Sequence, residues 1–171
     1  LKAAGLDMVY MGIESGDPQV LKDVKKGVTR EEMIEAGRKL KRCGILCSAT
    51  LISGLGGRQR LREHAIASAS LISAIKPDYV GFLTLMIDPQ APVYSKIVSG
   101  ELELLNPEDV VEEMKLFLQN VDSEGTVFRS NHASNYVILK GTLNEDIPSM
   151  LAYLRQVEEQ GKYREERWRR F

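Results

Sequence analysis

Residues 8–18 read M-V-Y-M-G-I-E-S-G-D-P, and this stretch decides the fold class. The apolar run at 8–13 lacks the alternation of polar and apolar residues, which is typical of a strand buried on both faces of a parallel sheet. The run ends abruptly on Glu14 and Ser15, and a G-D-P sequence suited to a turn and a helix start follows. The stretch therefore predicts a strand, a turn and a helix, with a carboxylate and a hydroxyl where the strand ends.

The same order of strand and helix recurs along the chain. Further strands are predicted at 45–53 and 79–87, and helices at 17–26, 29–43, 60–75, 106–121 and 144–160. Connections of this length suit right-handed crossovers, which place the helices outside a parallel sheet. These units would form either half of a β/α barrel or part of an open α/β sheet. Residues 126–139 differ, since they mix polar and apolar residues around R-S-N-H-A-S-N-Y.

Composition narrows the class of protein. With 171 residues, 43% hydrophobic and 27% charged, the chain suits one folded domain. A net charge of −1 gives no electrostatic reason to expect nucleic acid as a partner, and the basic residues at 162–171 are interpreted as a solvated helix end or tail. No apolar run approaches the ~20 residues that span a bilayer. Two cysteines make no disulfide framework, so a cytoplasmic setting is expected. Because the chain begins at Leu1 in what resembles a helix end, we expect it to be a piece of something longer.

Ligands of parallel α/β sheets bind at the carboxyl ends of the strands, where the loops gather. Glu14 and Ser15 could hold a sugar diol or an ammonium group, or Glu14 could cap a helix or pair with a lysine at the rim of the sheet. The G-L-G-G at 54–57 permits a close backbone approach to a ligand, although a plain strand-to-helix turn accounts for it nearly as well. It lacks the dinucleotide-binding fingerprint.

The remaining candidates are weaker. Cys43 and Cys47 are rejected as a metal motif, because one is predicted at a helix end and the other inside a buried strand. His64 is predicted to be solvated on a helix surface. His132 lies in a polar loop that either has a functional role or satisfies itself as a turn.

Three motifs in order resemble a known family. They are V-Y-M-G-I-E-S-G-D-P-Q-V-L-K-D-V-K-K-G-V-T, then A-T-L-I-S-G-L-G-G, then K-P-D-Y-V-G-F-L-T-L-M-I-D-P. Together they resemble the second half of a radical S-adenosylmethionine (radical SAM) barrel, and the match covers about residues 3–95. The stretch F-R-S-N-H-A-S-N-Y…L-K-G-T-L is similar to a compact subgroup of that family. The resemblance implies a partial (half) TIM-like barrel at 1–125, with a C-terminal polar loop and helix extension at 126–171.

The resemblance also implies a set of cofactor-binding residues. Family members cleave S-adenosylmethionine reductively at a [4Fe–4S] cluster, and the protein binds and orients that cofactor. Glu14 would contact the ribose hydroxyls with Ser15 as a helper, and Lys26 would pair with the methionyl carboxylate. Thr50 would lie on the ribose side, where a related branch has a carboxylate. The strand end at Leu85 and Met86 would bracket the adenine.

The substrate-side residues implied for this family lie in loops. Arg129, Asn131 and His132 are predicted to shape the site of an unknown substrate.

The cluster motif C-x3-C-x2-C is missing, since Cys43 and Cys47 have the first spacing but align with the wrong part of the barrel. We therefore expect an oxidoreductase-like parent enzyme, while this chain alone is expected to be inactive and to bind no cofactor. The strand at 8–13 would be exposed where the missing N-terminal half of the barrel pairs, which invites homodimerisation. The rival hypotheses are another β/α-barrel enzyme that binds a phosphorylated substrate, and a non-catalytic interaction module.

Overall fold

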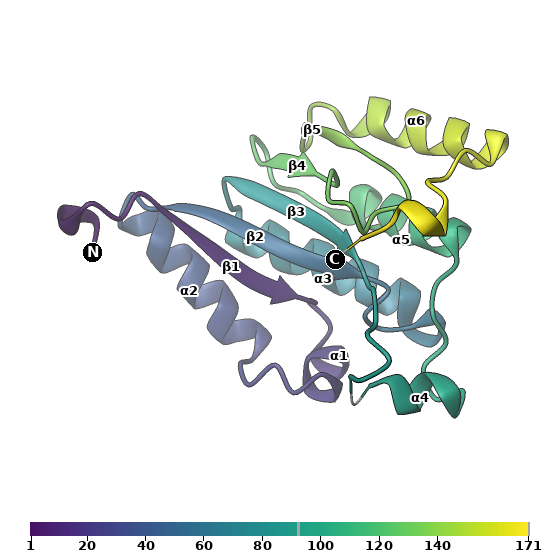
Figure 1. Ribbon diagram of the computed structural model, residues 1–171. Helices are drawn as coiled ribbons and strands as arrows, with labels where there is room; N and C mark the ends of the chain where they lie inside the picture. Colours follow the sequence, from purple (N-terminus) through teal and green to yellow (C-terminus); the bar gives the residue numbers. More distant parts are fainter. Residues whose placement is uncertain (92, 171) are drawn as a thin grey trace.

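The computed structural model describes residues 1–91 and 93–170, and it contains one five-stranded sheet (Figure 1). The strands follow the chain in the order β1 (Met8–Glu14), β2 (Leu46–Ser53), β3 (Tyr79–Thr84), β4 (Val127–Arg129) and β5 (Lys140–Thr142). Strands β1 to β4 pair in parallel, and β5 pairs with β4 in antiparallel fashion. The predicted α/β class with parallel β/α units is confirmed.

Helices connect the parallel strands. They are α1 (Pro18–Asp23), α2 (Arg30–Arg42), α3 (Leu61–Ile75), α4 (Tyr94–Val98) and α5 (Pro107–Asn120). Helix α6 (Ile147–Gln160) follows β5, and the short 3-10 turns are η1 (Lys2–Ala4), η2 (Arg58–Arg60) and η3 (Glu166–Trp168). None of the helices in the described ranges is both long and apolar enough to cross a membrane.

The helix starts follow from local side-chain chemistry. Thr29 and Glu32 form a reciprocal capping box at the start of α2. Asn106 and Asp109 form a second one at the start of α5, where Pro107 occupies the first turn. Asp17 accepts a hydrogen bond from the backbone N–H of Gln19 and so caps α1. The predicted starts of these three helices are confirmed.

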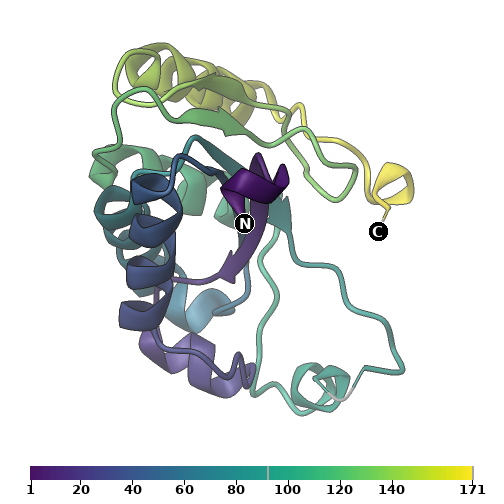
Figure 2. The same ribbon diagram turned by 90° about the vertical axis from the view of Figure 1, so that its left-hand side faces the viewer.

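The two faces of the sheet differ. Helices α2, α3 and α5 lie along one face, and no helix lies against the other face of β1 to β3 (Figure 2). Burial alternates accordingly along β2 and β3, because successive side chains point to opposite faces. The side chains of the helix-covered face include Ile13, Ala49, Leu51, Val80 and Phe82. We call the opposite side the open face, and it carries Tyr10, Gly12, Ser48, Thr50, Tyr79, Gly81 and Leu83.

The core lies between the covered face and the helices. Three aromatic rings form its centre: Phe117 of α5 lies 4.6 Å from Phe82 and 6.1 Å from Phe128, measured between ring centroids. All three side chains are buried. Aromatic contacts of this geometry join α5 to strands β3 and β4, which lie far apart in the sequence.

Several sequence predictions need correction. Strand β1 is not buried on both faces, since Tyr10 is 78% exposed on the open face. Strand β3 ends at Thr84 rather than Ile87. Strands β4 and β5 and helix α4 were not predicted, because three-residue strands and a five-residue helix carry too little periodicity. The predicted edge position of β1 is confirmed, since its other neighbour in the sheet is absent among the described residues.

Candidate functional site

Strand β1 ends in a backbone conformation that is unusual for its residue. Glu14 has a φ of +65°, and the pairing register with β2 shifts between Gly12 and Glu14. This left-handed conformation costs roughly 1 kcal/mol or more for a residue with a side chain. A Cβ atom at Gly12 would lie 2.4 Å from Oε1 of Glu14, so a larger residue there would displace the carboxylate from this position. The chain therefore accepts strain and a bulge to place this carboxylate at the strand end.

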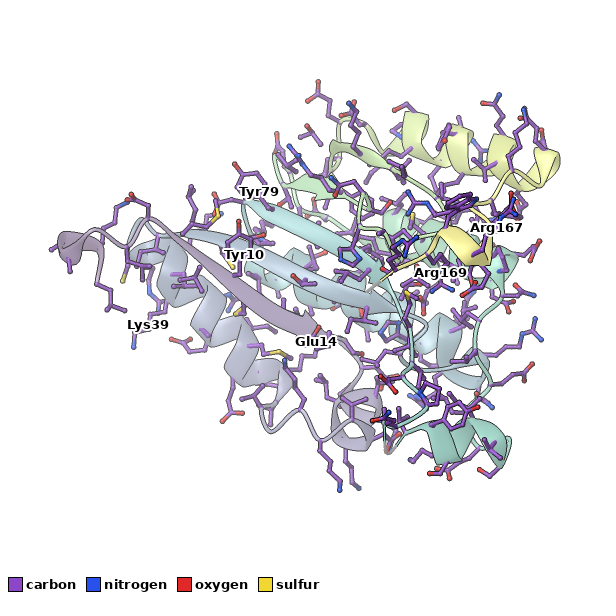
Figure 3. All side chains as sticks on the ribbon, viewed as in Figure 1. Tyr10, Glu14, Lys39, Tyr79, Arg167 and Arg169 are labelled. Atoms are coloured by element: carbon purple, nitrogen blue, oxygen red, sulfur yellow. The ribbon has the colours of Figure 1, made fainter. Side chains whose placement is uncertain are left out.

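Lys26 lies directly against this carboxylate. Its Nζ atom is 3.1 Å from Oε1 of Glu14, and the two side chains are 23% and 25% exposed. Figure 3 shows Glu14 at the end of β1. Lys26 follows α1, and its backbone N–H donates to the carbonyl of Leu21, which fixes the chain at this point. The two residues form a half-buried carboxylate and ammonium pair at the carboxyl edge of the sheet.

The turn after Glu14 is anchored on α3. The N–H of Gly16 donates to Oγ of Ser68 at 2.9 Å, and a Cβ at Gly16 would lie 2.3 Å from the carbonyl oxygen of Ala67. Ser15 is fully buried, and its hydroxyl accepts a hydrogen bond from the N–H of Asp17. The structure therefore places Ser15 inside the turn, where it orders the backbone that carries Glu14.

Strand β2 ends on a buried polar cluster. The Ser53 hydroxyl and the Gly54 N–H both donate to Oε2 of Glu113, at 2.5 and 2.9 Å. The other carboxylate oxygen lies 2.8 Å from Nδ1 of His64. His64 and Glu113 are 2% and 1% exposed, so the prediction of a solvated His64 is wrong. The packing of α3 against α5 buries that helix face.

Sequence reasoning missed Glu113 altogether. It lies on the apolar stripe of α5, three residues from Val110 and four residues from Phe117. A charged residue at such a position is rarely buried without a partner. A charged residue within an apolar stripe was therefore the available signal, but it did not indicate which residues pair with Glu113.

The G-L-G-G turn at 54–57 is covered rather than open. A Cβ at Gly57 would lie 2.7 Å from Cδ1 of Leu102 and 3.1 Å from the carbonyl oxygen of Glu103. The N–H of Arg58 donates to that same carbonyl, and the N–H of Gly57 donates to Gly54. These glycines admit a neighbouring segment of the chain, so the turn offers no ready cradle for a phosphate.

Thr50 lies on the open face in an uncrowded position. Its register partners are Gly12 on β1 and Gly81 on β3, and both lack a side chain. The threonine is half-buried. The open face therefore has no bulky side chain on either side of Thr50. This row of small residues reaches β1 at Gly12, two residues before Glu14.

The end of β3 is contacted by the C-terminal segment, residues 164–170. Leu85 and Met86 are half-buried, and the carbonyl of Leu85 accepts a hydrogen bond from Nη2 of Arg169 at 3.0 Å. Arg164 donates to backbone carbonyls of the 132–135 loop, with the shortest distance, 2.9 Å, to Ala133. The prediction of a solvated tail is therefore wrong for Arg164 and Arg169, and residue 171 lies outside the described residues.

The three predicted substrate residues do not meet Glu14. Arg129 and Asn131 line a hollow of about 410 Å³ on the open face, together with Tyr10, Ser48 and Tyr79. Tyr10 and Tyr79 lie near each other in Figure 3, toward the starts of their strands. His132 is exposed, and its Nδ1 atom lies 2.9 Å from Oγ of Ser134.

The described residues do not fit an iron–sulfur cluster. Cys43 is exposed at the end of α2, while Cys47 is buried in β2. Burial, followed by the charge of Asp78, raises the pKa of the Cys47 thiol to about 11. Within residues 1–91 and 93–170, no three histidine, cysteine or acidic side chains gather where they could hold a metal ion.

We expect contact between the C-terminal segment and the sheet to depend on pH. Burial opposes ionisation of Glu166, but hydrogen bonds from Arg169 and Tyr136 and the charge of Arg169 lower its pKa below 4.5. Burial, and then the hydrogen bond to Glu166, raises the pKa of Tyr136 to about 12. The contribution of Glu166 is present above pH 4.5 and is lost as the pH falls through its lowered pKa. The contribution of Tyr136 is present below pH 10.0 and is lost as the pH rises toward 12.

The fluorescence of Trp168, the only tryptophan of the chain, measures this dependence. The emission is expected to stay constant between pH 4.5 and pH 10.0 and to change below and above this range. A midpoint between pH 5 and 9 would contradict the assignment of Glu166 and Tyr136 as the titrating groups.

The geometry is that of a partial β/α barrel with a carboxylate and ammonium pair at the carboxyl end of its first strand. Residues 1–66 match the family model described as Radical SAM superfamily. The resemblance to this superfamily seen in the motifs is therefore confirmed for this part of the chain.

Three known proteins are similar to the chain. An uncharacterized methyltransferase of Pyrococcus horikoshii is 27% identical over 104 residues, which is 61% of this chain and 22% of the relative. A putative methylthiotransferase of Methanocaldococcus jannaschii is 38% identical over 52 residues, which is 30% of this chain and 12% of the relative. The structure of archaeal Methanocaldococcus infernus Elp3 with an N-terminal deletion matches with a TM-score of 0.64 at 21% identity, over 94% of this chain and 38% of that one.

The lengths and identities of these matches limit what each of them shows. The chain spans well under half the length of each of these proteins. At 21% identity the likeness to Elp3 shows the fold alone.

Proposed function

We propose that this chain supplies the ribose and carboxylate side of an S-adenosylmethionine site in a radical SAM enzyme. The observation that carries the proposal is the Glu14 carboxylate, which a strained left-handed turn holds at the carboxyl end of β1 with Lys26 at 3.1 Å. Strained residues at strand ends are typical of ligand sites, because a purely structural role could use a relaxed residue there.

The chemistry of the pair suits the two ends of this cofactor. A carboxylate accepts hydrogen bonds from both hydroxyls of a ribose, and an ammonium group pairs with the methionyl carboxylate. Both side chains are only about a quarter exposed, so their hydrogen bonds to a ligand would be less weakened by water than surface contacts. S-adenosylmethionine, when bound and cleaved in such an enzyme, supplies a 5′-deoxyadenosyl radical.

The remaining predicted residues take supporting places in the proposal. Thr50 would face the ribose from the row of small residues on the open face, and the backbone at Leu85 and Met86 would bracket the adenine. Ser15 would order the turn that carries Glu14. Arg129 and Asn131, with His132 beside them, would contact a substrate that enters the open face.

The proposal also concerns the rest of the enzyme. Residues 1–125 would be the C-terminal half of a radical-SAM-type barrel, with 126–171 as its extension, and a cluster-binding half would pair along the exposed edge of β1. The names of two relatives, a methyltransferase and a methylthiotransferase, support a parent enzyme, oxidoreductase-like in its use of the cluster, that transfers a methyl or methylthio group.

Replacing Glu14 with glycine tests the proposal. Glycine accepts the left-handed conformation without strain, so the relief of roughly 1 kcal/mol is expected to offset the lost ion pair and leave the free energy of unfolding within about 1 kcal/mol. Binding of S-adenosylmethionine, measured by ligand-observed NMR titration, is expected to weaken about tenfold or more, because each lost charge-assisted hydrogen bond is worth about 1.5–3 kcal/mol.

The matched variants are Lys26→Met and Lys22→Met. The first is expected to weaken binding to a similar degree, while the second removes an exposed lysine of α1 and is expected to change nothing. These variants are compared in the full-length parent enzyme, because the chain alone is expected to bind no cofactor. Undiminished binding in both Glu14→Gly and Lys26→Met would refute the proposed site.

A further inference from the structure

The C-terminal segment lies across the carboxyl end of β3, on the side of the open face (Figures 1 and 2). Arg169, labelled in Figure 3, is its most buried residue, with 9% of its surface exposed. Arg167 of the same segment is exposed and contacts Glu165, its sequence neighbour but one. Arg169 is thus built into the structure, whereas Arg167 is not.

The guanidinium of Arg169 has partners from three parts of the chain. Its Nε atom donates to the carbonyl of Ser134 at 2.6 Å, and Nη2 donates to the carbonyl of Leu85 at 3.0 Å. Its Nη1 atom contacts both carboxylate oxygens of Glu166 at 2.8 Å. The group also lies 4.0 Å from the centre of the Tyr136 ring, within the range of a cation–π interaction.

These contacts enclose one side of a small hollow of about 200 Å³. The opposite side is the ends of β2 and β3, and Leu104 and Leu105 add an apolar wall. The hollow is smaller than the ~300–1,000 Å³ of sites that take a whole ligand, so it suits one part of a ligand. Its apolar wall faces a rim with the Glu166 carboxylate, which accepts three hydrogen bonds and so has about one of its four acceptor sites left.

The geometry points to Arg169 as a positioning residue for the base of the bound nucleoside. The arginine fixes the carbonyl of Leu85 and carries Glu166 to the rim, so that the hollow takes a planar base with an exocyclic amino group. The C-terminal segment then forms the outer wall of the cofactor site, a role that rests on the proposed function. Arg169 acts through Leu85 and Glu166 and does not touch the reacting atoms.

Arg169→Gln in the full-length parent enzyme tests this role, with Arg167→Gln as the matched control. Arg169→Gln is expected to weaken binding of S-adenosylmethionine and of adenosine about tenfold and to leave binding of free methionine unchanged, because only the base side is altered. Arg167→Gln is expected to change none of the three affinities. In the ligand-free chain, Arg169→Gln is also expected to shift the emission of Trp168 to longer wavelength and to speed hydrogen exchange at 164–170.

The outcomes separate this inference from the proposed function. Wild-type affinity for adenosine in Arg169→Gln, while Glu14→Gly still weakens S-adenosylmethionine binding, would overturn the role of Arg169 alone. Unchanged binding in both variants would overturn the proposed site as well. A parallel loss of methionine binding in Arg169→Gln would assign the arginine to general stability and overturn the inference. If Arg169→Gln unfolds, Arg169→Lys replaces it, because lysine keeps the charge but lacks the planar guanidinium group. Wild-type affinity for adenosine in Arg169→Lys would also overturn the inference.

Discussion

Replacing Glu113 with alanine is expected to lower the free energy of unfolding by about 3–5 kcal/mol, because each of the three buried polar groups left unsatisfied costs about 1–3 kcal/mol. The carboxylate is 1% exposed and accepts hydrogen bonds from Ser53 and Gly54 and contacts His64. Alanine would leave all three polar groups buried without a partner. Their lost solvation, more than the lost bonds themselves, makes the effect large.

Glu112 provides the matched control, since it precedes Glu113 on the same helix. Its side chain is 49% exposed and pairs with Lys115, so Glu112→Ala is expected to cost less than about 1 kcal/mol. Urea denaturation followed by circular dichroism measures both variants. A loss below about 1 kcal/mol for Glu113→Ala would mean that water reaches the cluster and satisfies the orphaned groups.

The cluster also has a consequence for the proposed site. The buried Nε2 atom of His64 has no hydrogen-bond partner in the described structure. A buried nitrogen without a partner lowers the stability of the fold. The presence of this cluster at the end of β2 therefore fits a role in fixing the Ser53–Gly54 turn.

Replacing Phe117 with alanine is the second change with a large expected effect, again about 3–5 kcal/mol in the free energy of unfolding. The ring is fully buried and contacts Phe82 at 4.6 Å and Phe128 at 6.1 Å between centroids. Alanine would leave a cavity where α5 meets β3 and β4. Because β4 is only three residues long, we expect the loss to loosen the C-terminal part of the sheet first.

Tyr153→Ala is the control, because this ring on α6 is 45% exposed. It is expected to cost well under half as much, and Phe117→Leu is expected to fall between the two. Hydrogen exchange during denaturation reports which strands open. Equal protection of β1 and β4 in Phe117→Ala would contradict the expected loosening of the C-terminal part.

Local chemistry explains which parts of the fold could be predicted from the sequence. The Thr29 and Asn106 capping boxes and the G-D-P sequence after Glu14 act within a few residues, so the sequence shows them directly. A lysine partner for Glu14 at the rim of the sheet was one of the alternatives seen in the sequence, and the structure shows that Lys26 is that lysine. The short strands β4 and β5 escaped detection because their existence depends on pairing with β3.

The polar clusters show the opposite case. His64 and Glu113 lie 49 positions apart, and Arg169 and Leu85 lie 84 positions apart. The sequence around one residue of such a pair does not indicate which distant residue is its partner. His64 was therefore predicted to be solvated, and the C-terminal segment was predicted to be a solvated helix end or tail.

The sequence by itself determined the order of the longer strands and helices, the strand-end position of Glu14 and the resemblance to the radical SAM superfamily, because each depends on contiguous residues. Only the tertiary structure decided that one face of the sheet is open, that a buried carboxylate secures the turn after β2, and that Arg169 closes the end of β3. Those features arise when distant segments exclude water together, and burial of that kind is a property of the packed chain rather than of any stretch within it.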